Sequence, residues 1–145
     1  MEPARALILD ASALYGYVDR RDPRYATVRA MLKGWVGELV VSAYTAAEAD
    51  YLILNRLGLD AELAFLADLV DVYTVQALDD RGLAQVRELC AKYGDLRLGL
   101  ADASIVVLAD RWRTRSLATF DERHFRAVAP LAGGAFELLP TDSPA

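Results

Sequence analysis

The sequence predicts an α/β fold: three layers, with helices on both faces of a mostly parallel central sheet of about five strands. Two observations predict it. Short apolar runs alternate along the chain with stretches whose apolar residues recur at helical spacing. Several of these runs are followed by an acid or a hydroxyl residue, which favours the start of a helix. The 145 residues are enough for one domain with one hydrophobic core. We place that domain at residues 1–140 and expect a loose polar tail at 141–145.

The predicted strands are short apolar or alternating runs bounded by glycine, polar or charged residues. The first is continuously apolar from Ala6 to Leu9, which is typical of a strand buried on both faces. We expect this strand and the one that ends near Asp121 to be central in the sheet. The five strands are predicted at residues 5–9, 38–41, 71–75, 116–120 and 135–139.

The predicted helices lie between these strands. Segment 103–109 is ambiguous, because Ile105, Val106 and Val107 would also suit a buried strand. Its length and charged end favour a helix that continues to about Trp112. The helices are predicted at 11–18, from near Pro23 to Gly34, from residue 42 to about Arg56, from a cap at Asp60 past Leu69, at 83–92 after a cap at Asp79, from Asp102 to Trp112, and after Asp121.

Composition excludes several classes of protein. No apolar run reaches the roughly 18 residues that a membrane span needs. Residues 1–5 lack the basic segment of a secretion signal, so we expect a cytoplasmic protein without membrane contact. The single cysteine, Cys90, excludes an internal disulfide.

The charged residues give opposing indications about nucleic-acid binding. The net charge of −5 argues against tight, nonspecific binding of nucleic acid. Yet only two of the 16 basic residues, Lys33 and Lys92, are lysine, and arginine is the better bidentate ligand for phosphate. Each arginine cluster is either a phosphate contact or an ordinary solvated face. The clusters are at residues 20, 21 and 24, at 111, 113 and 115, and at 123 and 126.

Four acids follow, or lie just beyond, predicted strand ends. Asp10 and Asp121 each end an apolar run, Glu48 lies early in the helix after the second strand, and Asp102 precedes the apolar segment 103–109. Ligands of open α/β sheets bind beyond the carboxyl ends of the strands. If the four carboxylates meet there, they repel one another until a cation neutralises them. Because hard divalent cations prefer oxygen ligands, the acids predict metal-dependent chemistry on phosphate.

Each acid also has a purely local explanation. Asp10, Asp102 and Asp121 could each cap the helix that follows, and Thr45 with Glu48 matches a capping box. Capping does not explain why several helix starts share one sheet edge. Ser12 and Thr119 are expected to support the acids by hydrogen bonding, or only to stabilise their own turns. The lone His124 is expected to be a surface or packing residue.

The chain resembles the PIN-domain ribonucleases, especially the toxin subunits of bacterial VapBC-type toxin–antitoxin pairs. Four stretches carry the resemblance, and they occur in the family's order over nearly the whole chain. They are Leu-Ile-Leu-Asp-Ala-Ser at 7–12, Val-Ser-Ala-Tyr-Thr-Ala-Ala-Glu at 41–48, Gly-Leu-Ala-Asp-Ala-Ser-Ile at 99–105, and Ala-Thr-Phe-Asp-Glu-Arg-His-Phe at 118–125.

The resemblance implies a site and partners. Asp10, Glu48, Asp102 and Asp121 would be the catalytic residues and the ligands of one or two Mg²⁺ or Mn²⁺ ions. The substrate would be RNA, and the protein would form a homodimer. A cognate antitoxin would cover the cleft. A partner surface near Tyr15, Tyr17 and Trp35 would suit it, although burial in the core explains these residues equally well.

Three alternatives remain. A phosphatase of the haloacid-dehalogenase type also begins with an acid at a strand end, but it needs a second Asp where this chain has Ser12. A receiver domain needs a lysine at a later strand end, and Lys33 and Lys92 both lie in predicted helices. The third alternative is a non-catalytic PIN-like interaction domain that keeps the acids without using them.

Overall fold

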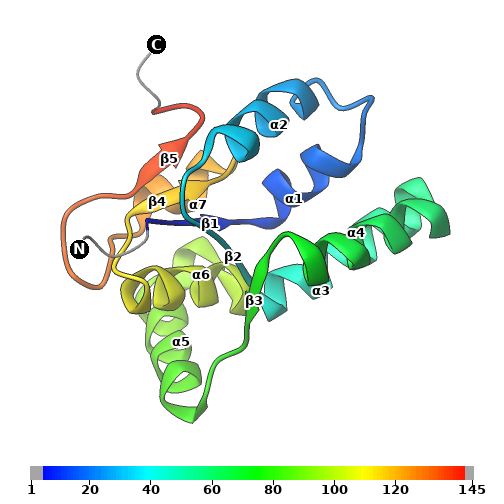
Figure 1. The fold of residues 1–145 in the computed structure, drawn as a ribbon. Coiled ribbons are helices and arrows are strands. Elements are labelled where there is room, and N and C mark those ends of the chain that lie inside the picture. Colours follow the sequence, from blue (N-terminus) through cyan, green and yellow to red (C-terminus); the bar gives the residue numbers. More distant parts are fainter. Residues whose placement is uncertain (1–4, 143–145) are drawn as a thin grey trace.

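The central sheet is fully parallel in the computed structural model, which describes residues 5–142 (Figure 1). Its order is β3-β2-β1-β4-β5, so β1 is central and pairs with β2 and β4. This confirms the predicted parallel sheet of five strands and the interior positions predicted for the first strand and for the strand before Asp121. The strands are β1 (Ala6–Leu9), β2 (Glu38–Ser42), β3 (Thr74–Gln76), β4 (Ser116–Ala118) and β5 (Glu137–Leu139).

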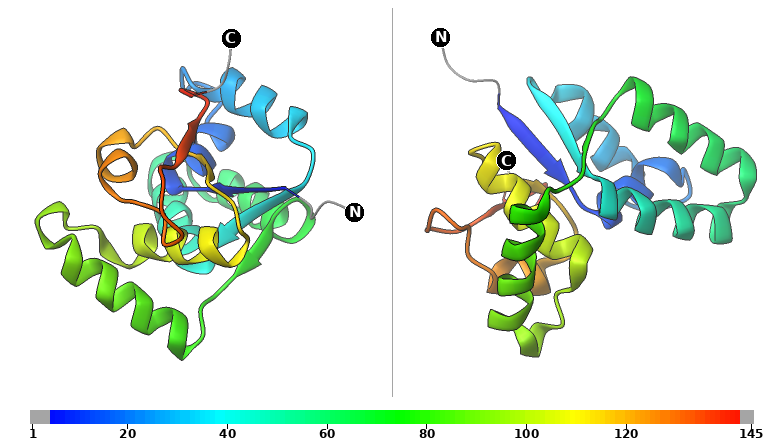
Figure 2. Two further views of the ribbon diagram at one scale, coloured as in Figure 1. Left: turned by 90° about the vertical axis from the view of Figure 1, so that its left-hand side faces the viewer. Right: turned by 90° about the horizontal axis from the view of Figure 1, so that it is seen from below.

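Helices cover both faces of the sheet (Figure 2). Alternate residues of β1 belong to two separate cores, as the two-residue period of a strand requires. Leu7 and Leu9 pack with the first four helices, whereas Ala6 and Ile8 pack with the later ones. The first set is α1 (Ala11–Val18), α2 (Tyr25–Gly34), α3 (Ala43–Leu57) and α4 (Leu59–Asp71); the second is α5 (Asp80–Lys92), α6 (Gly99–Arg111) and α7 (Glu122–Ala127), with a 3₁₀ turn at Gly94–Leu96.

The ambiguous segment 103–109 is helical, as predicted, and forms most of α6. Every residue from Ala103 to Ala109 is buried. A helix buried all round needs no polar face, so its sequence loses the amphipathic pattern that distinguishes a helix from a strand. This burial explains why residues 105–107 also suited a buried strand.

The prediction of a strand at 71–75 was wrong in its position. The last turn of α4 extends to Asp71, and β3 covers only Thr74–Gln76. The backbone N–H groups of Val72 and Tyr73 donate to the carbonyl of Asp68, at 2.8 and 3.1 Å. These residues therefore complete the helix and cannot also pair with the sheet.

Two glycines fix turns of the chain. Gly58, with a φ of 93°, occupies the N-cap position of α4, so the prediction that Asp60 caps this helix was wrong; Asp60 lies in its first turn. Gly37, with a φ of 138°, leads into β2. A Cβ atom at Gly37 would lie 2.0 Å from the carbonyl oxygen of Arg5, so no other residue fits there without a backbone shift.

The described part of the predicted tail is held in place. The carboxylate of Asp142 accepts hydrogen bonds from Arg126, at 2.8 Å, and from the backbone N–H of Leu138, at 2.7 Å. The rest of that prediction, residues 143–145, lies outside the described residues. Between residues 5 and 142, no helix combines the length and the apolar composition that crossing a bilayer requires.

Candidate metal centre

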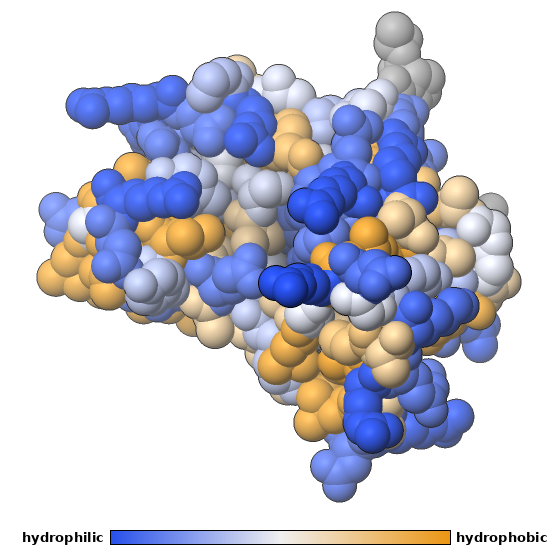
Figure 3. All heavy atoms as spheres, turned by 180° about the vertical axis from the view of Figure 1, so that it is seen from behind, coloured by the Kyte–Doolittle hydropathy of each residue, from blue (hydrophilic) through white to orange (hydrophobic). Residues whose placement is uncertain are grey.

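All four predicted acids line one cleft at the carboxyl edge of the sheet, with a volume of about 260 Å³. Asp10 directly follows β1, and Asp121 lies just beyond β4. Glu48 lies in α3, after β2, and Asp102 lies in the first turn of α6. In Figure 3, the surface is hollowed between the α1–α2 arm and the α3–α4 arm, and hydrophilic residues lie on both sides of the hollow.

Asp10 is the most buried of the four, with only 5% of its surface exposed. One carboxylate oxygen accepts hydrogen bonds from the Ser12 hydroxyl, at 2.7 Å, and from the backbone N–H of Ala13, at 3.0 Å. The other accepts from the Thr119 hydroxyl. Burial raises the pKa of Asp10 to about 6, although the hydrogen bonds from Thr119 and Ser12 oppose that rise. The protein therefore holds a carboxylate where its charge is unfavourable without a cation.

Local capping explains only two of the four acids. Asp10 caps α1, and Asp121 caps α7 by accepting from the backbone N–H of His124, at 3.2 Å. The capping box proposed for Glu48 does not form, because Ser42 is the N-cap of α3. Asp102 caps nothing either: Leu98 holds the N-cap position of α6, without a side-chain bond. Glu48 and Asp102 therefore have no capping role in the described structure.

Asp102 is the electrostatic centre of the cluster. Burial raises its pKa, the hydrogen bond from His124 lowers it, and the charge of Asp121 raises it. The charge of Asp102 in turn raises the pKa values of Asp10 and Glu48, in both cases as a smaller contribution than burial. Asp102 is thus close enough to each of the other three carboxylates for their charges to repel.

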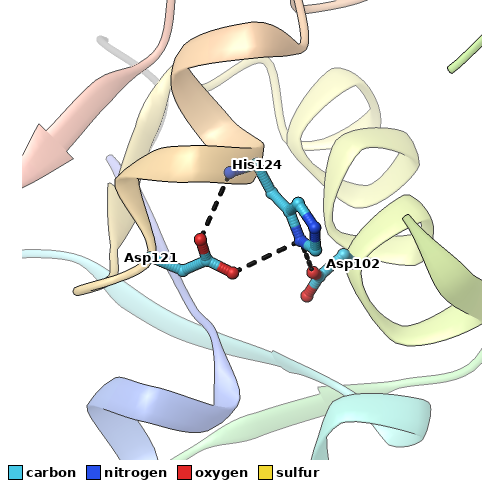
Figure 4. Close-up of side chains that lie close together, drawn as sticks. All are labelled: Asp102, Asp121 and His124. Atoms are coloured by element: carbon cyan, nitrogen blue, oxygen red, sulfur yellow. Dashed lines mark hydrogen bonds and ion pairs between the residues drawn. The ribbon is translucent and has the colours of Figure 1, made fainter. Parts of the chain in front are cut away.

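His124 contacts two of the acids, a position that the sequence did not predict (Figure 4). Its Nδ1 atom lies 2.6 Å from Asp102 and 3.3 Å from Asp121, and its Nε2 atom lies 3.1 Å from the carbonyl oxygen of Leu96. Ligand atoms of Asp102, Asp121 and His124 all lie within 4.8 Å of one another. The sequence feature that could have predicted this position is the spacing of His124 from Asp121, because a residue three positions after a capping acid faces that acid across the first helical turn.

Ser12 and Thr119 connect the turns after β1 and β4. The Ser12 hydroxyl donates to Asp10 and accepts from the backbone N–H of Phe120, at 3.0 Å. The Thr119 hydroxyl donates to Asp10 and accepts from the backbone N–H of Asp121, at 2.8 Å. Each hydroxyl therefore bonds both the buried carboxylate and a backbone N–H group of the turn after β4.

The chemistry of the donor set suits a hard divalent cation. The cleft brings several carboxylates together, and one of these groups, Asp10, is buried and has a raised pKa. Mg²⁺ and Mn²⁺ favour such oxygen ligands, and Mn²⁺ also accepts imidazole nitrogen. No lysine lines this cleft.

Comparison with known proteins identifies the family. The model of the PIN domain family matches residues 7–130. This chain belongs to the PIN domain family. A PIN-domain relative, ribonuclease VapC26 of Mycobacterium tuberculosis, is 43% identical over 135 residues, which cover 92% of this chain and all of the relative. These matches confirm the resemblance predicted from the sequence.

Solved structures share the PIN fold. The crystal structure of VapC20 from Mycobacterium tuberculosis, described as a toxin that cleaves the sarcin–ricin loop, aligns with a TM-score of 0.77 at 18% identity. The alignment covers 83% of this chain and 94% of VapC20. The VapBC2 structure from Rickettsia felis, bound to a promoter DNA fragment, aligns with a TM-score of 0.67 at 14% identity and covers 92% of this chain and 98% of that one. At such identities the likeness is one of fold.

Proposed function

We propose that this chain is a metal-dependent endoribonuclease and the toxin of a toxin–antitoxin pair. The observation that carries the proposal is the convergence of Asp10, Glu48, Asp102 and Asp121 on one cleft from four separate segments of the chain. Close similarity over nearly the full length to a protein named as a ribonuclease supports the same reaction. Residues 1–140 would act as a single nuclease domain, working on RNA in the cytoplasm.

The four acids would hold one or two Mg²⁺ or Mn²⁺ ions, directly or through water. Such an ion lowers the pKa of bound water and polarises a phosphoryl oxygen, which is the chemistry that phosphodiester hydrolysis requires. The protein holds the metal-binding side chains in fixed positions. Asp10 is fixed by three hydrogen bonds, and Asp102 is oriented by His124. Preorganised ligands avoid the loss of conformational entropy that binding would otherwise require.

The other acidic-site functions fit the cleft poorly. Ser12 stands where a haloacid-dehalogenase phosphatase would need its second Asp, and it instead donates to Asp10. Lys33 and Lys92 lie in α2 and α5, and neither lines the cleft that a receiver domain would use. A non-catalytic domain would have no need to keep a buried acid with a raised pKa.

An antitoxin and a second copy of the chain are the proposed protein partners. Tyr15, Tyr17 and Trp35 pack partly buried against the core, which leaves little reason to assign them to a partner. A better candidate surface lies on α3 and α4, where large apolar side chains are exposed to solvent. They are Tyr51, Leu54, Leu59, Leu63, Leu66 and Val70.

Cleavage of total cellular RNA tests the proposal. The wild-type protein and Asp10→Asn are compared with Mg²⁺ and with a chelator, and RNA fragments are followed on denaturing gels. We expect the variant to lose on the order of 10³-fold in rate, since losing a metal ligand removes several kcal/mol of transition-state stabilisation. Asp79→Asn is the matched control, because Asp79 caps α5 outside the cleft. Equal cleavage by wild type and Asp10→Asn, or cleavage that survives chelation, would overturn the proposal.

A further inference from the structure

Two arginines line the same cleft as the four acids. Arg24 occupies the N-cap position of α2, and Arg56 lies in the last turn of α3. Both are exposed to solvent. Among residues 5–142, five carboxylates line this cleft when Asp22 is counted, and these two guanidinium groups are the only positive charges in its lining.

Arg56 extends the cleft along α3. Glu48, Leu52 and Arg56 are spaced four residues apart, so they lie on one face of the helix, and all three line the cleft. Eight residues of helix place Arg56 about 12 Å along the axis from Glu48, at 1.5 Å per residue. This separation places Arg56 away from the acidic end of the cleft, where it suits contact with another part of a long substrate.

Both arginines rest on aromatic rings at or next to the site. The guanidinium carbon of Arg24 lies 4.7 Å from the ring centre of Phe120, the residue between Thr119 and Asp121. That of Arg56 lies 5.5 Å from the ring centre of Tyr15, which also lines the cleft. Contact with a ring orients a guanidinium group and restricts its motion while leaving N–H groups free to donate.

Neither arginine is neutralised as Arg111 and Arg126 are. Arg126 contacts both Glu122 and Asp142, and Arg111 contacts Asp79 at 2.7 Å. Within residues 5–142, Arg56 forms no salt bridge, and Arg24 forms only a 3.5 Å pair with Asp22. Their capacity to bind an anion is therefore largely unused.

We propose that Arg24 and Arg56 bind backbone phosphates of the RNA on either side of the bond that is cut. The inference rests on the proposed nuclease function and assigns the residues that position its substrate. An acid-lined cleft repels a polyanion, and a bound ion attracts only the phosphate next to it. Two oriented guanidinium groups further out would attract and align the flanking phosphates.

The test measures RNA binding separately from cleavage. All variants are made in the Asp10→Asn background, and binding of a fluorescein-labelled, random-sequence, single-stranded RNA is followed by anisotropy over a range of salt concentrations. We expect Arg24→Gln and Arg56→Gln each to weaken binding by roughly three- to tenfold and to flatten the salt dependence by about 0.7 per arginine, the value for single strands. Arg56→Lys should keep the salt dependence but regain only part of the affinity, because it loses the bidentate geometry.

Arg87→Gln is the matched control, since Arg87 is exposed on α5 and does not line the cleft. Unchanged melting temperatures establish that each variant is folded. Unaltered affinity and salt dependence in both Arg24→Gln and Arg56→Gln would overturn the inference. Because wild-type cleavage is measured independently, such a result would leave the proposed nuclease function standing. Absent cleavage by the wild type would instead overturn the nuclease function on which this inference rests, whatever RNA the arginine variants bind.

Discussion

Asp10 and Asp79 cap helices in the same way and differ in everything else. Each accepts from the backbone N–H three residues later, at 3.0 Å for Asp10 and 2.8 Å for Asp79. Asp79 is exposed and bound to Arg111 at 2.7 Å, and that hydrogen bond lowers its pKa. Asp10 is buried without a cation, and its pKa rises to about 6.

The difference separates a structural acid from a candidate ligand. The local sequence accounts for both residues equally, because an Asp before a helix is favourable in either place. Only the surroundings distinguish them. Asp79 is stabilised by a partner that the protein supplies, whereas Asp10 is held by three hydrogen bonds in a position where its charge still lacks a counterion.

The largest predicted difference between Asp10 and Asp79 is in how each affects the pH dependence of stability. Between the ordinary value of 3.8 and the folded pKa of about 6, the folded protein binds more protons at Asp10 than the unfolded chain does. The free energy of unfolding of the metal-free protein therefore falls as the pH rises through this window, by up to roughly 3 kcal/mol. Asp102 and Glu48, whose pKa values are also raised, act in the same direction. Urea unfolding in the presence of a chelator measures the profile.

Two asparagine variants separate the effect of the carboxylate charge from the effect of helix capping, because Asn caps a helix as well as Asp does. Asp10→Asn should flatten the profile and stabilise the metal-free protein at pH 7 by about 1–2 kcal/mol, after roughly 1 kcal/mol is lost with the Thr119 hydrogen bond. Asp79→Asn should leave the profile's shape between pH 4 and 6 intact and slightly lower stability, because Arg111 loses its partner. Parallel profiles for wild type and Asp10→Asn would contradict this account.

A smaller contrast is predicted between the two threonines that flank β4. The Thr119 hydroxyl bonds the Asp10 carboxylate and the Asp121 backbone, whereas the Thr114 hydroxyl bonds only backbone groups, the carbonyl of Ala6 at 2.7 Å and the N–H of Ser116 at 3.1 Å. Thr119→Val should cost about 2 kcal/mol at pH 7, where Asp10 is charged, and less at pH 4.

Thr114→Val should destabilise the protein by a similar amount at both pH values, because its partners do not titrate. Chemical unfolding of the two variants at pH 4 and pH 7 measures the difference. If Thr119→Val is equally destabilising at both, the hydroxyl does not act on a titrating carboxylate.

The sequence predicted most of the fold because strand and helix signals rarely conflicted. The continuous apolar run of β1 and the acids after β1 and β4 placed the central strands correctly. Prediction failed at the two ends of α4, where local backbone hydrogen bonds and a glycine turn set the boundaries. The helical bonds of Val72 and Tyr73 displaced β3, and Gly58 replaced Asp60 as the cap of α4. Neither the position of β3 nor the glycine cap of α4 can be predicted from the spacing of apolar residues.

The sequence predicted the acidic residues of the cleft but not the other residues that surround it. Strand ends and the family resemblance pointed to Asp10, Glu48, Asp102 and Asp121. The roles of Glu48 and Asp102 became distinct from capping only once Ser42 and Leu98 were seen at the N-cap positions. Arg24 and Arg56 reach the cleft from two different helices through the direction of their side chains, which the sequence pattern does not encode, whereas the spacing of His124 from Asp121 was a usable signal.

Direct binding of Mn²⁺ tests most sharply whether the four acids form one metal site. Electron paramagnetic resonance measures free Mn²⁺ during titration of the wild type, Asp102→Asn and Asp110→Asn. Asp110 shares α6 with Asp102 but does not line the acidic cleft. We predict that the wild type and Asp110→Asn bind Mn²⁺ equally, that Mg²⁺ displaces it, and that Asp102→Asn weakens binding by about tenfold or more. Equal affinity for Asp102→Asn and the wild type, or no binding by the wild type, would contradict the assignment.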